Sequence, residues 1–401
     1  MHTAFPKFMR AIRTIAKLAL PVGIPVLLAL LWLDHARETT LPTPTGPFSV
    51  GRITDVWTDE LQPGQQRKLL VWIWYPTAPR RPSTKADDYL PTPWRAAVEQ
   101  QRGIFISQFL TRDLSRVRAH GIRNAELSPQ HPSYPVVLMR AGLAALVANY
   151  TSLAEELASR GYIVVGFDAP YRSSVVVFPD GRVITRAPEE NADLVSGSEQ
   201  EQLLNELVRD WNSDMGFALD QLERLNRSGP SARFPLRLDM ERVGVFGHSL
   251  GGATALQFCH DDSRCRAGID VDGAPRGSVI REGVTQPFMF LVSDHRSEPD
   301  PETRPVLANI RSIYDRLPGD RRWWLMIRGA NHYGFSDDGA ILKTPLLMRA
   351  LRTIGIVHLS GLRQIAVTAH YITTFFDVYL KSEPASELTN RAQYPEVEYI
   401  H

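Results

Sequence analysis

The sequence predicts an α/β protein in which a mostly parallel central sheet is covered by helices on both faces. Short apolar runs alternate along the chain with longer amphipathic segments, which is the order of strands and helices in such folds. Several apolar runs have no polar face, as in YPVVLMRAG (134–142) and YIVVGFDAP (162–170). Strands of this kind are buried on both sides, so the sheet needs helices above and below it.

The first elements are bounded by proline and glycine. Residues 68–76 form an apolar strand that ends at Pro76, because proline lacks the N–H that a strand interior needs. Residues 77–133 show no regular pattern and are expected to form a cap over the sheet, with 335–362 as a second cap element. The buried strand 134–142 then runs into a glycine turn.

Helices and strands continue to alternate after this turn. Residues 150–161 form a helix closed by Gly161, which leads directly into the strand 162–170, and residues 198–226 form a long helix. The remaining predicted strands are 243–246, 266–275, 287–294 and 322–332. A chain of 401 residues with 43% hydrophobic content can bury one large core, so residues 47–401 are expected to be one catalytic domain.

The charge balance excludes one class of partner. Lys and Arg number 45 and Asp and Glu 44, which leaves a formal net charge of +1. Proteins that bind nucleic acids concentrate positive charge, and this chain has no such excess. No nucleic-acid partner is expected.

The N-terminal region, residues 1–34, has the pattern of a targeting or membrane segment. The apolar run LALPVGIPVLLALLWL (18–33) carries no charge until Asp34, and basic residues precede it at Lys7, Arg10, Arg13 and Lys17. The absence of a small-x-small cleavage site after it favours an uncleaved anchor over a cleaved signal. Residues 35–46 then form a Pro/Thr linker. The catalytic domain is expected outside the cytoplasm, in the periplasm if the source is bacterial.

The two cysteines, Cys259 and Cys265, close the short loop CHDDSRC. In an oxidising compartment they would form a disulfide between the end of one helix and the next strand. A metal site with the neighbouring His260 is the alternative, but no second pair of ligands stands at zinc spacing. The sequence therefore predicts a disulfide and no metal.

The stretch RVGVFGHSLGGATALQF (242–258) predicts a nucleophilic serine. Ser249 lies between Gly247 and Gly251, where a buried strand passes into a helix. A turn this sharp strains the backbone of its central residue and leaves no space for side chains two positions away on either side. The N–H groups at the start of the following helix can then stabilise an oxyanion during acyl transfer.

A serine nucleophile needs a histidine base and an acid that orients it, in the chain order Ser, Asp or Glu, His. His332 is the predicted base, because it follows the last strong strand in the loop RGANHYGFSD. His295 also follows a strand, but it stands where an acid or a loop is expected. His260 lies on the helix after Ser249, and the C-terminal segment with no strand-then-loop pattern carries His358, His370 and His401. Three acids lie at the ends of strands, namely Asp270, Asp272 and Asp294. Spacing alone does not decide between Asp272 and Asp294 as the orienting acid.

The motifs GHSLGGAT, AGIDVDGAP and RGANHYGFSD together resemble the platelet-activating-factor acetylhydrolase family, the plasma-type phospholipase A2 group, with its bacterial dienelactone-hydrolase-like relatives. The resemblance runs from GPFSVGRITDVW to FFDVYLKSE, and it implies an α/β-hydrolase fold with Asp272 as the acid. It also implies an oxyanion hole of the Leu250 and Leu143 N–H groups. Ala141 stands where the family usually has His, and Ala144 where Gly is common.

This resemblance implies a calcium-independent carboxylic ester hydrolase that needs no cofactor. Its substrates would be esters of short acyl groups, in phospholipids or in small soluble molecules. A peptidase or amidase with the same triad is one alternative, and a non-catalytic binding protein of the same fold is another. The intact elbow, acid and base favour an enzyme.

Overall fold

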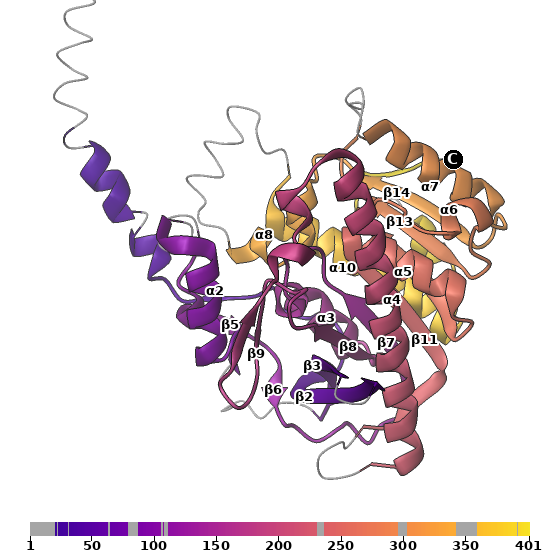
Figure 1. Ribbon diagram of the computed structural model, residues 1–401, viewed down its shortest axis with the longest axis horizontal. Helices are drawn as coiled ribbons and strands as arrows, with labels where there is room; N and C mark the ends of the chain where they lie inside the picture. The colour runs from indigo at the N-terminus through magenta and orange to yellow at the C-terminus, as the bar shows by residue number, and fades with distance from the viewer. Residues whose placement is uncertain are drawn as a thin grey trace, which may run out of the picture.

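The computed structural model describes residues 21, 23–30, 32–62, 65–78, 87–105, 107, 111–230, 236–295, 303–341, 359–390 and 392–401. Within them, a ten-stranded sheet forms the centre of the molecule (Figure 1). Its strands are, in spatial order, β15 (Val397–Tyr399), β14 (Arg322–Ile327), β13 (Phe288–Val292), β12 (Cys265–Val271), β11 (Leu238–His248), β7 (Tyr134–Arg140), β8 (Ile163–Asp168), β3 (Gln65–Thr77), β2 (Ser49–Gln62) and β6 (Ile122–Arg123).

The central strands of the sheet are parallel, as the sequence predicts. Strands β8, β7, β11, β12, β13 and β14 each run parallel to their neighbours within this group, whereas β15 and β3 are antiparallel to the strands beside them. The carboxyl ends of the parallel strands therefore meet at one edge of the sheet. That edge is where open α/β sheets place their ligand sites.

Both faces of the sheet are covered, because successive residues of each strand point to opposite sides. On one face, Val137 and Met139 of β7 pack in the same core as α3 (Thr151–Ser159) and α10 (Gly361–Lys381). On the other face, Val136 and Leu138 pack in the same core as α4 (Gly197–Ser228), α5 (Leu250–Asp261) and α7 (Thr303–Arg316). The expected α/β architecture is confirmed.

Described residues from the expected cap, 77–133, contribute to a small layer at one side of the sheet. Strands β1 (Thr39–Thr40), β5 (Val117–Ala119) and β4 (Asp87–Asp88) make a three-stranded sheet, and α2 (Thr92–Phe105) lies beside it (Figure 1). The remaining strands and short helices are β9 (Val175–Val177), β10 (Val183–Thr185), α6 (Val279–Glu282), α8 (Asp338–Ile341) and α11 (Ser386–Thr389), with 3₁₀ turns at η2 (Leu114–Arg116), η3 (Val147–Tyr150), η4 (Pro188–Glu190), η5 (Ala192–Leu194) and η6 (His332–Phe335). Of the second expected cap, residues 342–358 lie outside the described residues.

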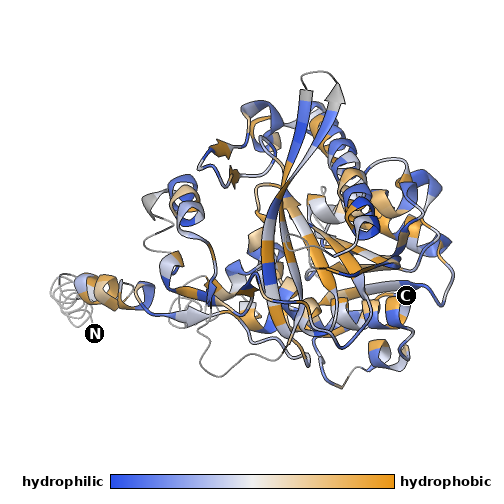
Figure 2. Cartoon of the chain, turned by 90° about the horizontal axis from the view of Figure 1, so that it is seen from below, coloured by the Kyte–Doolittle hydropathy of each residue, from blue (hydrophilic) through white to orange (hydrophobic). Residues whose placement is uncertain are grey.

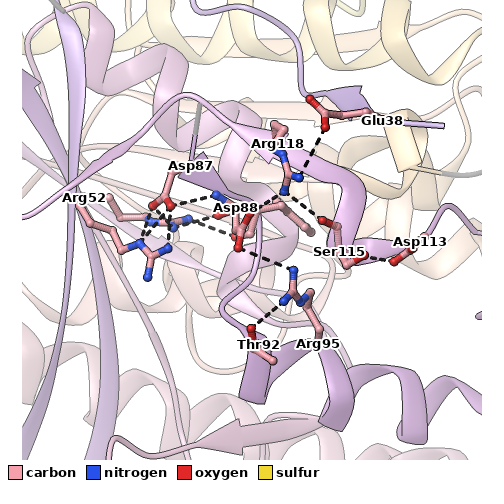
Figure 3. Close-up of polar contacts among 11 residues, drawn as sticks. Glu38, Arg52, Asp87, Asp88, Thr92, Arg95, Asp113, Ser115 and Arg118 are labelled. Carbon is pink, nitrogen blue, oxygen red and sulfur yellow. Dashed lines mark hydrogen bonds and ion pairs between the residues drawn. The ribbon is translucent and has the colours of Figure 1, made fainter. Parts of the chain in front are cut away.

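A network of ion pairs joins this layer to the main sheet (Figure 3). Asp87 accepts hydrogen bonds from Arg52 of β2 at 2.9 Å and from Arg123 of β6 at 2.7 Å. Asp88 pairs with Arg118 of β5, and Glu38 lies 3.5 Å from the same guanidinium. Arg52 is only 2% exposed; its burial lowers its pKa, and the charge of Asp87 opposes that shift. The buried charge has carboxylate partners, as a buried charge requires.

The N-terminal segment is docked on the domain at its carboxyl end. The carbonyl oxygen of Thr111 lies 3.0 Å from Nδ1 of His35, and Arg112 pairs with Asp34 at 3.3 Å. Further along, the Thr45 hydroxyl donates to Glu156 at 2.6 Å. The expected linker, residues 35–46, therefore lies against the catalytic domain.

Residues 23–30 and 32–35 are helical, and Figure 2 shows this hydrophobic helix standing away from the body of the domain. Its large apolar side chains are exposed: Ile24, Val26, Leu27, Leu28, Leu30, Trp32 and Leu33. Among the described residues, none of the helices has both the length and the apolar character that a membrane crossing requires. Residues 18–20, 22 and 31 of the expected anchor lie outside the described part of the chain.

The predicted disulfide is present. Cys259, near the end of α5, is bonded to Cys265 at the start of β12, with an S–S distance of 1.97 Å. Both residues are fully buried. The bond ties the helix that follows Ser249 to the strand that leads to Asp272.

Candidate active site

The turn at Ser249 has the geometry of a nucleophile elbow. Ser249 joins β11 to α5 with φ 57° and ψ −127°, a conformation that costs free energy for any residue with a side chain. A Cβ atom on Gly247 would lie 2.0 Å from the carbonyl oxygen of Gly251, and a Cβ on Gly251 would lie 2.4 Å from that of Arg140. Only glycine fits at these two positions. The Ser249 N–H donates to Val271 at 2.9 Å, which holds the turn beside the end of β12.

His332 and Asp272 are directly hydrogen-bonded. His332 is the first residue of η6, which follows β14, and its Nδ1 lies 2.8 Å from Oδ2 of Asp272. Asp272 follows β12 with φ 53°, which turns its carboxylate toward the histidine loop. With Nδ1 donating to the carboxylate, Nε2 of His332 is left without a proton and can accept one.

Asp272 is held in its ionised form by its neighbours. Its side chain is 6% exposed, and such burial alone would raise its pKa. Hydrogen bonds from His295, His332 and Ser293 outweigh burial and lower the pKa of Asp272 well below its usual range. The Ser293 N–H and hydroxyl both donate to Oδ1, at 2.7 and 2.9 Å.

The elbow lies close to this pair. The Ser249 N–H donates to the carbonyl of Val271, the residue before Asp272, and the His248 ring centroid is 4.5 Å from that of His332. Within the described residues, no hydrogen bond joins the Ser249 hydroxyl to His332. Such contacts in enzymes without substrate are often long and shorten when substrate binds.

The two other candidate acids have different partners. Asp294 accepts a hydrogen bond from the Gly329 N–H at 2.6 Å and so ties the end of β13 to the loop after β14. Asp270 accepts from the Gly273 N–H at 2.8 Å behind the elbow. Burial raises the pKa of Asp270 to about 8. Neither carboxylate is hydrogen-bonded to His332 in the described structure.

His295 is a neighbour of the acid that sequence reasoning did not place there. Its Nε2 lies 3.6 Å from Oδ1 of Asp272 and 3.3 Å from the Ser293 hydroxyl. Ser293 and His295 are two residues apart directly after β13, so both reach the same side of the chain. That spacing at a strand end was the available signal.

The loop after β7 lies against the elbow. A Cβ on Gly142 would lie 3.1 Å from Cβ of Ser249, so the two backbones are in close contact. The Ala145 N–H donates to the Gly142 carbonyl, which closes a turn with Ala144 at φ 61°. This positive φ accounts for the preference for glycine at position 144. Leu143 lies in this turn, and Leu250 is the first residue of α5, where an N–H has no acceptor within the helix.

An apolar wall borders these two leucines. Leu250 packs in one buried cluster with Leu207, Val208 and Trp211 of α4, and Leu143 packs against this cluster. Leu203 and Leu204, one turn earlier on α4, are partly buried against the same cluster. The long helix predicted at 198–226 therefore packs against the elbow through this apolar cluster.

No three His, Cys, Asp or Glu side chains of the described residues are grouped so that they could hold a metal ion.

The fold and the serine elbow define an esterase of the α/β-hydrolase type. Residues 34–381 match the model of the family described as platelet-activating factor acetylhydrolase, isoform II. The chain belongs to this family, as the sequence motifs indicate.

Individual relatives agree with this assignment. The chain is 24% identical to platelet-activating factor acetylhydrolase of Bos taurus over 83% of this chain and 76% of that protein. It is also 24% identical to a probable 1-alkyl-2-acetylglycerophosphocholine esterase of Arthroderma benhamiae, over 90% of this chain and 93% of that protein. The solved structure of a ferulic acid esterase from Streptomyces cinnamoneus matches with a TM-score of 0.72 and 29% identity, covering 91% of this chain and all of that one.

Proposed function

We propose that the protein is a serine carboxylic ester hydrolase in which Ser249 is the nucleophile, His332 the base and Asp272 the orienting acid. The observation that carries this proposal is the 2.8 Å contact between His332 and Asp272 beside the strained turn at Ser249. A strained serine between obligatory glycines has no evident structural purpose, since serine gives no packing advantage there. In this proposal the three residues have the roles of a catalytic triad.

The mechanism follows from these positions. Nε2 of His332 takes the proton of the Ser249 hydroxyl while its oxygen attacks the ester carbonyl carbon. The N–H groups of Leu250 and Leu143 stabilise the oxyanion that forms. Asp272 accepts from Nδ1 and stabilises the positive charge on His332.

The reaction is completed through an acyl-enzyme. His332 gives its proton to the leaving alcohol, and the acyl group remains on the Ser249 oxygen. Water then attacks the acyl-enzyme with His332 again as base, which releases the carboxylic acid and regenerates Ser249. No step uses a metal or a cofactor.

We propose esters of short acyl groups as the substrates, either in phospholipids or in small soluble molecules. The names of the Bos taurus and Arthroderma benhamiae relatives support an acetyl ester of a glycerophospholipid, and the Streptomyces cinnamoneus neighbour acts on a different ester.

A panel of p-nitrophenyl esters from acetate to dodecanoate, beside the matching p-nitroanilides, tests this proposal. We expect the highest kcat/KM for acetate or butyrate and negligible turnover of the amides. Faster turnover of the amides would favour a peptidase or amidase.

We further propose that residues 18–33 anchor the protein in a membrane and that the catalytic domain lies outside the cytoplasm. The basic residues before this segment and the exposed apolar side chains of the helix at 23–30 support this proposal.

Deletion of residues 1–33 should release an active enzyme into the soluble fraction, because the contacts of Asp34 and His35 with Arg112 and Thr111 are retained. Fractionation and the esterase assay measure both effects. Deletion of residues 1–46 is the matched comparison, since it also removes β1 and the bond from Thr45 to Glu156, and it should lower the thermal midpoint. A full-length chain found in the soluble fraction would contradict the anchor.

A further inference from the structure

His248 directly precedes Ser249 in the elbow, at a position where the serine motif does not require a particular residue. Its side chain is 7% exposed and lies between catalytic elements, with its ring centroid 4.5 Å from that of His332 at an interplanar angle of 38°. Phe335, in the same 3₁₀ turn as His332, lies 5.7 Å from the His248 ring. The His248 ring is therefore a surface against which the histidine loop rests.

A buried tyrosine fixes the His248 ring. The hydroxyl of Tyr150, the last residue of η3, lies 2.8 Å from Nδ1 of His248, and Tyr150 is 2% exposed. The same hydroxyl accepts a hydrogen bond from the Gly142 N–H at 3.3 Å. Three segments meet at this hydroxyl: the turn that carries Leu143, the elbow, and the start of α3.

The Tyr150 hydroxyl bonds both neighbours at once. A backbone N–H can only donate, so the Tyr150 oxygen accepts from Gly142 while it also lies within hydrogen-bond distance of Nδ1 of His248. The Gly142 N–H is used in this contact, which leaves Leu143 as the next donor in that turn.

His248 and Tyr150 each keep one protonation state at neutral pH. Burial lowers the pKa of His248 to about 3, and the neighbouring His332 also lowers it. Burial raises the pKa of Tyr150 well above its usual value. The His248 ring is thus neutral, and it does not repel the positive charge that His332 acquires when it takes the serine proton.

We infer that Tyr150 and His248 form a positioning pair, which orients the His332 ring and holds the turn of Leu143 against the elbow. This inference rests on the proposed function. Neither residue exchanges a proton with the substrate; each acts through His332 or through the Gly142 backbone. The pair links His332 to the turn that carries Leu143. Loss of either Tyr150 or His248 should therefore disturb the positions of His332 and of that turn.

A double-mutant cycle of Tyr150→Phe and His248→Phe tests the pair with p-nitrophenyl acetate as substrate. Phenylalanine keeps a ring at each position but removes the hydrogen bond, and His248→Phe still tests the pair if Tyr150→Phe does not fold. We expect each single variant to lower kcat on the order of 10- to 100-fold with KM nearly unchanged, because the base is misplaced in the transition state. The kcat of the double variant should be no lower than that of the less active single variant, since both substitutions remove the same contact.

Tyr134→Phe is the matched control. Tyr134 is also buried, at 1% exposure, and its hydroxyl donates to the Ser128 carbonyl at 3.0 Å, at the start of β7. Its loss should lower the thermal midpoint as much as Tyr150→Phe does but leave kcat unchanged.

Three outcomes would overturn the inference. They are full kcat in Tyr150→Phe, a loss confined to KM, and effects of the single variants that multiply in the double variant. Each of these outcomes leaves Ser249 as the nucleophile of an active wild-type enzyme. A folded wild-type protein that neither hydrolyses the ester nor reacts with a fluorophosphonate would instead overturn the proposed function, and the pair would fall with it.

Discussion

Replacement of Ser249 with alanine is expected to lower ester turnover by at least about 1000-fold, because the proposed nucleophile is removed and the remaining groups give only residual catalysis. Alanine keeps the Cβ atom of the elbow, and the described structure shows no hydrogen bond from the Ser249 hydroxyl that stability would depend on. The thermal midpoint should therefore stay near that of the wild type. Measurement of kcat on p-nitrophenyl acetate together with the thermal midpoint checks both expectations.

Ser228→Ala is a suitable control for this variant. Ser228 ends α4, and its exposed hydroxyl donates only to the Arg224 carbonyl among the described residues. Full activity is expected there. A Ser249→Ala protein that kept wild-type turnover would place the nucleophile elsewhere in the chain.

The second large effect is expected at Asp272. Replacement with asparagine should lower kcat on the order of 10⁴-fold, nearly as much as His332→Ala, because His332 would favour the wrong tautomer and its positive charge would lose a partner. The carboxylate that lies 2.8 Å from Nδ1 is the group removed. Steady-state kinetics on p-nitrophenyl acetate measure the loss.

Asp294→Asn is the matched comparison for Asp272→Asn. Asp294 accepts from the Gly329 N–H, and the amide oxygen of asparagine can accept the same bond. Activity and thermal midpoint should both stay close to the wild-type values. If Asp294→Asn were the inactive variant and Asp272→Asn the active one, the acid would lie after β13 and not after β12.

The central strands could be predicted because they are buried on both faces and leave continuous apolar runs in the sequence. Strand β2 was missed, since residues such as Asp55, Thr58 and Glu60 make Ser49–Gln62 look like a loop. Its partner β3 pairs with it along nearly its whole length, a contact that no local pattern contains. Strand β15, only Val397–Tyr399, is likewise defined by its pairing with β14.

Local patterns also explain which residues of the site could be recognised in the sequence. The elbow of Ser249 is specified by glycines two residues away, and His332 by its place after a strand, so both can be recognised in the sequence. Spacing alone does not identify the acid, because Asp272 and Asp294 both follow strands, and only the family resemblance indicated Asp272. Tyr150 comes from a segment about 100 residues before His248, and their contact exists only in the folded chain.

The N-terminal region shows the same limit of local patterns. Its Pro and Thr content is typical of a linker, but Thr45 and His35 are bound to distant parts of the domain. Composition reports which residues favour a regular element and carries no information on which surface they contact.

The measurement that tests the central claim most directly is covalent labelling of the folded protein with a fluorophosphonate, followed by mass spectrometry of the peptides. The account predicts one adduct, on the peptide that contains Ser249. The adduct should be absent in Ser249→Ala and should form much more slowly in Asp272→Asn, since the serine is activated through His332. Absence of labelling in the folded wild-type protein, or an adduct on another residue, would contradict the assignment of Ser249 as the nucleophile of an ester hydrolase.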